Sequence, residues 1–489
     1  MSIVSKGAET SIKRAALINM ASRYLSGFIS MLYSILLARI LSPADFGIVA
    51  IAQVFVTFLQ LFCDMGFGSA VVQRQDLTPE NVSGLFGFSA VLGSILGIIM
   101  ALLAFPMSIV YREPALVGIF IGLAPSIFFA TINTVPNALL MKSKRFMLVG
   151  VRQIVSVILC SILGLVTALL GAGPYAIIIF SIANNFVLFL WNYLTYPIKP
   201  SISGSRDAVG SVWGYSAYLF GFNFINYFSR NADNLLIGYY FGKTALGNYA
   251  KAYQLMLYPQ NNLTGTITAV VHPMLAEHQN DIERIYGVYI RMTKALSLLG
   301  VFFSVICCFC ADEIVLLLYG DGWGQAATCL KFLSVSIWSQ MVCGSSGAMF
   351  QVLNRTKEHF IRGVLIAVVL VGSIMVGVAA GSVESVAFAV GIAYNVPFIL
   401  MLPFLIKRSF GKSQLAFLRT LLPDFLIAIG LCAVLSAVSL IPFEHWLTAF
   451  AVKLLVGTAA YFVFLVVLGQ AHWIIDFLPA KMKQKLSRK

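Results

Sequence analysis

Charged side chains are scarce in this sequence. Only 11% of the 489 residues are Asp, Glu, Lys or Arg, whereas a soluble globular domain carries roughly 25%. Hydrophobic residues make up 59% of the chain, and the mean hydropathy is +0.89. These values exclude an ordinary soluble domain and indicate a polytopic integral membrane protein.

Histidine is rare as well, which argues against a membrane-embedded enzyme. A polymerase or acyltransferase would need clustered histidines and acids, but the five histidines lie in loops or at the ends of apolar runs. The eight cysteines lie in or at the ends of apolar runs, so they predict packing residues rather than disulfides or a metal site. No metal or cofactor is therefore expected.

Long apolar runs recur along almost the whole chain. A helix of about 20 residues spans the ~30 Å hydrocarbon core of a bilayer, and we find fourteen runs of that order. Their approximate ranges are 15–40, 46–68, 84–105, 115–139, 148–170, 174–196, 212–241, 246–271, 292–318, 326–353, 360–381, 384–406, 420–441 and 448–470. The sequence therefore predicts an all-α integral membrane protein with about 14 transmembrane helices.

The distribution of basic residues predicts the orientation. Lys and Arg in short loops stay on the cytoplasmic side, and 25 of the 33 basic residues gather at alternate helix ends and in the tail 471–489. The opposite connections, such as SPAD, GAGP and GSVE, are short and hold few of them. We therefore expect both termini in the cytoplasm. Topology and anionic headgroups account for the net charge of +14, so no nucleic-acid partner is expected.

One apolar run, 212–241, carries a polar stripe. Helical spacing places six of its residues on one face: Asn223, Asn226, Tyr227, Arg230, Asp233 and Asn234. An Arg or Asp that faced lipid would cost roughly 3 kcal/mol at the helix centre, so this face must contact protein or water. Two interpretations remain open. The stripe lines a cavity, or it hydrogen-bonds a neighbouring helix.

A repeat of 200 residues favours the cavity. The shift lays LLARILSPADFGIVAIAQ (36–53) on LIGYYFGKTALGNYAKAY (236–253) and pairs Gly47 with Gly247, Ala50 with Ala250 and Ala52 with Ala252. It also lays Arg23, Ser26, Ser30 and Ser34 on Asn223, Asn226, Arg230 and Asn234. Two lobes related by an axis along the membrane normal are typical of transporters that bind substrate at the repeat interface.

The repeat predicts the domain organisation. The N-terminal lobe (1–200) and the C-terminal lobe (212–406) have six helices each and surround a central cavity. The remaining parts are an inter-lobe cytoplasmic linker (201–211), a cytoplasmic loop (407–419), two additional helices (420–470) and the basic tail (471–489). Because one chain holds both halves of the pathway, we expect a functional monomer.

Three segments resemble a known family. LLARILSPADFGIVAIAQVF (36–55), DMGFGSAVVQR (64–74) and DNLLIGYYFGKTALGNYAKAYQL (233–255) are similar to signature segments of the polysaccharide transporter family. That family comprises the Wzx-type lipid-linked oligosaccharide flippases of the multidrug/oligosaccharidyl-lipid/polysaccharide exporter superfamily. The resemblance covers essentially the whole chain and is strongest for exporters of the colanic-acid type.

The resemblance implies a function. Such a flippase moves undecaprenyl-diphosphate-linked oligosaccharides to the outer leaflet of the bacterial cytoplasmic membrane by alternating access, for cell-surface polysaccharide biosynthesis. Membrane lipids are implied partners, as are a polysaccharide polymerase and its assembly machinery. A proton gradient, a sodium gradient or the membrane potential would couple transport. The alternatives are a cation-coupled multidrug antiporter of the same superfamily, whose cavity should be more acidic and aromatic, and a polysaccharide-assembly enzyme in the membrane.

The embedded cations are candidates for binding the diphosphate. Arginine suits phosphate because its planar fork forms paired hydrogen bonds, and the candidates in the central helices are Arg23, Arg230 and Lys251. Sugars need amide, hydroxyl and aromatic partners. The candidates for glycan binding are Asn223, Asn226, Tyr227, Asn133 and Asn137, together with Tyr218.

The embedded acids have two competing interpretations. Asp64 could pair with Arg23 as an inner gate, and Asp233 could neutralise Arg230 three residues earlier on the helix. Alternatively, Asp64 or Asp233 titrates as a site for the coupling ion. Arg39 lies at the outer end of its helix, where a structural or gating role is expected.

Overall fold

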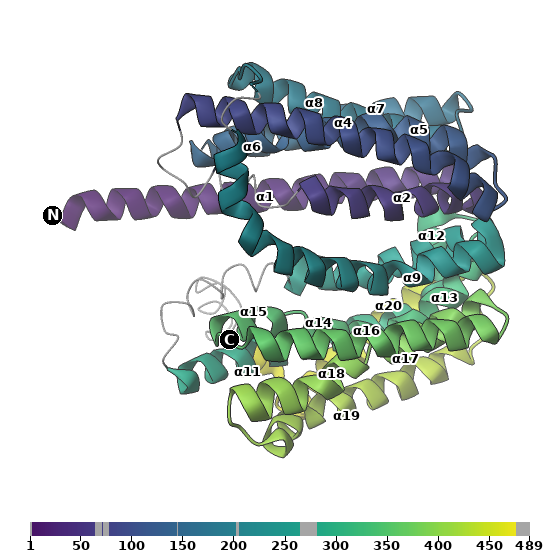
Figure 1. Cartoon of the computed structure of the whole chain (residues 1–489). Helices are drawn as coiled ribbons and strands as arrows, with labels where there is room; N and C mark the ends of the chain where they lie inside the picture. The colour runs from purple at the N-terminus through teal and green to yellow at the C-terminus, as the bar shows by residue number, and fades with distance from the viewer. Residues whose placement is uncertain are drawn as a thin grey trace. The chain divides into compact units, whose positions relative to one another are not determined.

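The computed structural model describes residues 2–63, 71, 78–143, 145–201, 205–264 and 281–475 (Figure 1). Side chains are described from residue 21 onward and, within residues 205–259, from residue 227. These parts of the chain are helical and contain no strand. This confirms the predicted all-α membrane fold.

Among the described residues, eleven helices are long and apolar enough to cross a membrane, or twelve if a bent pair is counted as one span. The bent pair, Gly324–Ser334 and Ile337–Val352, turns by 52° at its break. A further 55-residue helix, α9 (Ser205–Pro259), joins two helices at a kink at Gly242. It covers the seventh predicted span and the first half of the eighth. The number fourteen stays a prediction.

The chain folds into two compact units, residues 1–247 and 248–489. The first unit contains α1 (Ser2–Ile40), α2 (Pro43–Cys63), α4 (Pro79–Val110), α5 (Ala115–Ile132), α6 (Thr134–Lys142), α7 (Phe146–Leu169), α8 (Tyr175–Thr195) and the start of α9. In this unit α5 packs on α2, α4 and α8, and α7 packs on α1 and α8. Figure 1 shows α4, α5, α7 and α8 as one layer of the unit.

Local sequence sets the helix boundaries in this unit. Ser42 and Asp45 cap the start of α2 reciprocally: the Ser42 amide donates to Asp45 Oδ2 (2.9 Å), and the Asp45 amide donates to Ser42 Oγ (3.3 Å). Thr78 caps α4 by accepting from the Asn81 amide at 3.2 Å. The turn between α7 and α8 places Gly171 and Gly173 at φ +85° and +55°, where a Cβ would be strained.

The second unit begins at Asn248 and contains the rest of α9. Its further elements are η1 (Gln260–Thr264), α11 (Ile282–Phe309), α12 (Ala311–Tyr319), α13 (Gly324–Ser334), α14 (Ile337–Cys343), α15 (Ser346–Val352), α16 (Thr356–Ala379), α17 (Val383–Ala393), α18 (Val396–Met401), η2 (Leu402–Ser409), α19 (Gln414–Ser439), α20 (Trp446–Val467) and α21 (Ala471–Ile475). Helix α11 is the most enclosed of the candidate spans and packs on α13, α14 and α19, while α17 packs on α13 and α16.

Two buried ion pairs fasten the additional helices to this unit. Lys294 of α11 pairs with Asp424 of α19, and the exposures of the two side chains are 1% and 0%. Ser297 Oγ donates to the other carboxylate oxygen of Asp424 at 2.6 Å. Lys453 of α20 pairs with Glu313 of α12 at 2.5 Å. The 25 basic residues that predict the orientation include Lys294, which is thereby assigned to a cytoplasmic loop or helix end. This placement is wrong, because its charge is compensated inside the helix bundle.

Candidate functional site

Helices α2 and α9 touch backbone to backbone at two glycines. A Cβ on Gly47 would lie 2.6 Å from the carbonyl carbon of Lys243, and a Cβ on Gly247 would lie 2.7 Å from that of Pro43. In the 200-residue repeat, Pro43 is equivalent to Lys243, and Gly47 is equivalent to Gly247. The contact of Gly47 with Lys243 and the contact of Gly247 with Pro43 are therefore equivalent contacts in the two repeats. Only a residue without a Cβ allows this approach. We call this contact the glycine crossing.

Polar contacts surround the glycine crossing. Lys243 Nζ lies 2.7 Å from Glu113 Oε2, with both side chains partly exposed. Tyr111 Oη donates to the carbonyl oxygen of Leu235 at 3.2 Å. Burial raises the pKa of Tyr111 to about 12, so the phenol remains a proton donor at neutral pH. Lys243 and Glu113 come from connections predicted to face outward, so the glycine crossing lies at the end of the helices away from the basic loops.

The polar stripe of α9 divides into packed and exposed members. Tyr227 Oη donates to the backbone carbonyl of Val54 in α2, and Phe58 packs against Phe228 with ring centroids 4.9 Å apart. Asp233 is 2% exposed, whereas Arg230 is exposed. Part of the stripe therefore joins helices, as the second interpretation predicts, and Arg230 remains accessible. The side chains of Tyr218, Asn223 and Asn226 lie outside the described residues.

Two further cations named as site candidates, Arg23 and Arg39, lie on α1. Arg23 is exposed along the helix, and Arg39 is exposed at its C-terminal end. Asp64, the predicted partner of Arg23, lies outside the described residues. The inner gate between Arg23 and Asp64 therefore stays a prediction.

Lys251 belongs to the second unit, and its side chain is buried there. Its side chain is 4% exposed, and its ammonium group lies 5.4 Å from the centre of the Tyr319 ring, which is the geometry of a cation–π contact. Nearby, Asn248 Oδ1 accepts from the Ala326 amide at 3.1 Å. The predicted diphosphate ligands thus have different environments, since Arg23 and Arg230 are exposed and Lys251 is enclosed.

Asn133, at the N-terminus of α6, and Asn137, within α6, are predicted to bind the glycan, but both side chains already hydrogen-bond other residues of the protein. Asn133 Oδ1 accepts from Asn192 Nδ2 at 2.6 Å, and Asn137 Oδ1 accepts from Arg152 Nη2 at 2.6 Å. Asn192 lies on α8 and Arg152 on α7. Asn133 and Asn137 therefore join three helices in this state, and a sugar would have to displace these contacts.

Two buried arginines were not identified from the sequence. Arg152 and Arg362 are 3% and 4% exposed, and each is the seventh residue of a 24-residue helix, α7 or α16. Each donates to a short helix that precedes its own: Arg152 to Asn137 of α6, and Arg362 Nη1 to Ser346 of α15 at 3.1 Å. Both belong to the 25 basic residues that predict the orientation and are thereby assigned to loops or helix ends. Their equal position in two equivalent helices is the one signal in the sequence that could have identified them.

The surroundings of the two arginines differ. Arg362 Nη2 also donates to the Pro397 carbonyl oxygen at 3.1 Å, and its guanidinium lies 5.8 Å from the centre of the Phe350 ring. Nε and Nη1 of Arg152 have no hydrogen-bond partner among the residues that the structure describes. No group of three His, Cys, Asp or Glu that could hold a metal occurs in those parts of the chain.

Comparisons with known proteins agree with this architecture. The family described as polysaccharide biosynthesis protein matches residues 36–328. Among relatives, the teichuronic acid biosynthesis protein TuaB of Bacillus subtilis (strain 168) is 24% identical over 410 residues, covering 82% of this chain and 83% of that protein. The lipopolysaccharide biosynthesis protein WzxC of Escherichia coli (strain K12) is 22% identical over 410 residues, with 83% of each chain covered.

Solved structures share the fold at low sequence identity. The lipid II flippase MurJ, in an inward closed conformation, superposes with a TM-score of 0.71 at 15% identity, covering 92% of this chain and 98% of MurJ. An inward-facing multidrug resistance MATE family transporter of the MOP superfamily gives 0.60 at 16% identity, covering 84% and 98%. Since the family match spans more than half of the sequence, this chain belongs to the polysaccharide biosynthesis protein family.

Proposed function

We propose that this protein flips undecaprenyl-diphosphate-linked oligosaccharides across the bacterial cytoplasmic membrane by alternating access. The names of its relatives support the cargo, since they include a succinoglycan biosynthesis transport protein, ExoT of Rhizobium meliloti (strain 1021). The fold shared with the lipid II flippase MurJ supports the activity. Both termini would lie in the cytoplasm, and one chain would form the pathway.

The glycine crossing is the contact that we expect to form and separate during alternating access. Alternating access requires two states that differ by a few kcal/mol. The backbone contact at Gly47 and Gly247 is close enough to exclude a side chain, while the ion pair beside it is half-exposed and contributes only ~0–1 kcal/mol. In this mechanism the crossing closes the outer side and separates when the protein opens outward.

Exposed arginines would receive the headgroup. Arg230 and Arg23 lie on helices related by the repeat and are exposed, so each can offer hydrogen bonds to the diphosphate. Lys251 would join only after it leaves the Tyr319 ring. Asn133, Asn137, Asn223, Asn226 and Tyr227 would bind sugars, and Asp64, Asp233 and Arg39 would gate the pathway or bind the coupling ion.

Flipping of a lipid-linked oligosaccharide in proteoliposomes tests the proposal. Arg230→Ala should abolish flipping while the protein remains folded, and Arg230→Lys should restore part of it, because a point charge replaces a planar fork. The control is Arg291→Ala, which removes another exposed arginine, on α11, whose Nε donates to a backbone carbonyl. If Arg230→Ala flips at the parent rate, the proposed binding role is wrong.

A cation-coupled drug antiporter is the second candidate, because MATE transporters share the fold. Efflux of cationic drugs from the same vesicles separates the two functions. We expect flipping without drug efflux, and drug efflux without flipping would favour the second candidate.

A further inference from the structure

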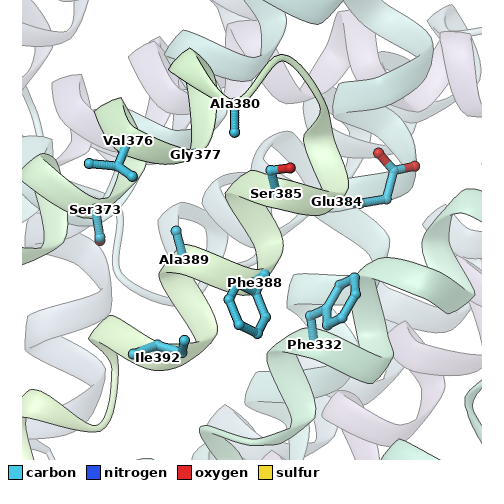
Figure 2. Close-up of a pocket in the computed structure, with 10 residues that line it drawn as sticks. All are labelled: Phe332, Ser373, Val376, Gly377, Ala380, Glu384, Ser385, Phe388, Ala389 and Ile392. Atoms are coloured by element: carbon cyan, nitrogen blue, oxygen red, sulfur yellow. The ribbon is translucent and has the colours of Figure 1, made fainter.

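A groove of about 720 Å³ lies on the second unit between α13, α16 and α17 (Figure 2). Small side chains line it, among them Ser373 of α16, Ala380 immediately after α16, and Ala389 of α17. Phe332 of α13 and Phe388 of α17 flank it. The lining is almost wholly apolar, which fits a hydrocarbon chain.

Close helix contacts create the groove. A Cβ on Gly377 would lie 2.6 Å from the Cα of Val386, and a Cβ on Gly391 would lie 3.1 Å from the carbonyl carbon of Phe332. Helix α17 therefore approaches both α16 and α13 closely. The groove is thus a consequence of backbone packing and does not depend on one flexible side chain.

The groove opens toward the surroundings of the helix bundle. Val376, Phe388 and Ile392 at its edges are 69%, 52% and 53% exposed. In a membrane-spanning helix such apolar surface contacts lipid. A lipid chain could therefore enter from the side without crossing the interior of the protein.

The groove begins at the level of the lipid headgroups. Glu384 is the second residue of the candidate span Val383–Ser409, and the preceding span ends at Ala379. From Glu384 to Ile392 the groove follows nine residues of α17, whose eight steps cover about 12 Å at 1.5 Å per residue. That is less than half of the ~30 Å hydrocarbon core, so the groove stays within one leaflet.

Its polar end carries a negative charge. Glu384 is the only ionisable residue among those lining the groove, and Gln325 Nε2 donates to its Oε1 at 2.9 Å. Because Gln325 is neutral, this contact leaves the carboxylate charge in place. An anionic headgroup would be repelled at this position, and an ammonium group would be attracted.

We propose that this groove binds one phospholipid whose headgroup carries an ammonium group, with an acyl chain along α17 and the ammonium beside Glu384. The site is distinct from the proposed transport path and does not rest on the proposed cargo. The diphosphate of that cargo is the wrong charge for Glu384, so the occupant is a membrane lipid that accompanies the protein.

Native mass spectrometry of the full chain in detergent tests the site. Dioleoyl phosphatidylethanolamine and dioleoyl phosphatidylglycerol are added at equal concentration, so the two lipids differ only in headgroup. We expect about tenfold preference for phosphatidylethanolamine, which corresponds to ~1.4 kcal/mol. Glu384→Gln should reduce the preference to about one, and Ala389→Leu, which fills the groove, should release both lipids.

The matched control is Ala433→Leu, which adds the same side chain at an exposed position of α19 and should leave lipid retention unchanged. Variants are compared only if their melting temperatures match the parent protein, and the charge and filling variants test the site independently. The proposal is overturned if the parent retains both lipids equally, if Glu384→Gln keeps the preference, or if Ala389→Leu retains lipid as the control does.

Discussion

At the scale of single residues, Gly47 and Gly247 are the positions of the α2–α9 contact that cannot accept a side chain. Each lies against the backbone of the other helix, so even one methyl group must push the helices apart. Gly27 on α1 has no such constraint, since a Cβ there would meet nothing within 4 Å. This difference gives a matched pair of substitutions.

We expect Gly47→Ala to shift the protein toward the outward-open state by about tenfold or more, equivalent to at least ~1.4 kcal/mol. The measurement is the rate at which a membrane-impermeant maleimide labels a cysteine replacing Leu246, which is fully buried beside the contact. Labelling should accelerate in Gly47→Ala and remain slow in Gly27→Ala. Equal rates in both variants would show that the contact does not open.

The two buried arginines should respond differently to removal of their charge. Arg362 makes two hydrogen bonds and lies beside an aromatic ring, so Arg362→Met should lower the melting temperature in detergent. Arg152 makes one, so Arg152→Met removes a poorly compensated buried charge and should leave the melting temperature unchanged or raise it. A large loss of stability in Arg152→Met would contradict this difference.

At the scale of elements, apolar runs located most of the membrane helices but not their interruptions. The predicted span 115–139 is two helices that meet at Asn133, and the predicted span 326–353 is three, α13 to α15. Hydropathy cannot reveal such breaks, because the residues on both sides are equally apolar. They form where side chains from other helices, such as Asn192, contact the break.

The same limit applies to the candidate site. The 200-residue repeat aligned Gly47 with Gly247, because identical residues at equivalent positions are visible in the sequence, but it did not predict that each glycine contacts the backbone of the other helix. The partners of Asn137 and the burial of Arg152 depend on contacts between helices. A count of basic residues cannot distinguish a loop arginine from one that lies two turns inside a helix.

The Lys294–Asp424 pair tests how α19 is held in place. Asp424→Leu leaves a buried ammonium without its counter-charge and should lower the free energy of unfolding by about 3–5 kcal/mol. The double variant Lys294→Met/Asp424→Leu should recover most of that loss, since no isolated charge remains. Denaturation midpoints in detergent give the coupling energy, and a double variant no more stable than Asp424→Leu would exclude this explanation.

At the scale of the whole molecule, the proposed orientation rests on the distribution of basic residues and can be measured directly. Single cysteines at Gly320 and Ser382 should be labelled by an impermeant reagent added outside intact cells, and a cysteine at Arg145 should not. All three positions lie between helices. The opposite pattern would reverse the proposed direction of transport and the assignment of the glycine crossing to the outer side.

The two ion pairs of the additional helices also constrain how the chain is made. Glu313 of α12 precedes Lys453 of α20 by 140 residues, and Lys294, inside the candidate span Ile282–Phe309, precedes Asp424 by 130. A lone charge in a helix centre costs about 2.5–3.5 kcal/mol. The charge of Lys294 is therefore compensated only after α19 has been synthesised, so the last part of the chain completes the charge balance of a helix made much earlier.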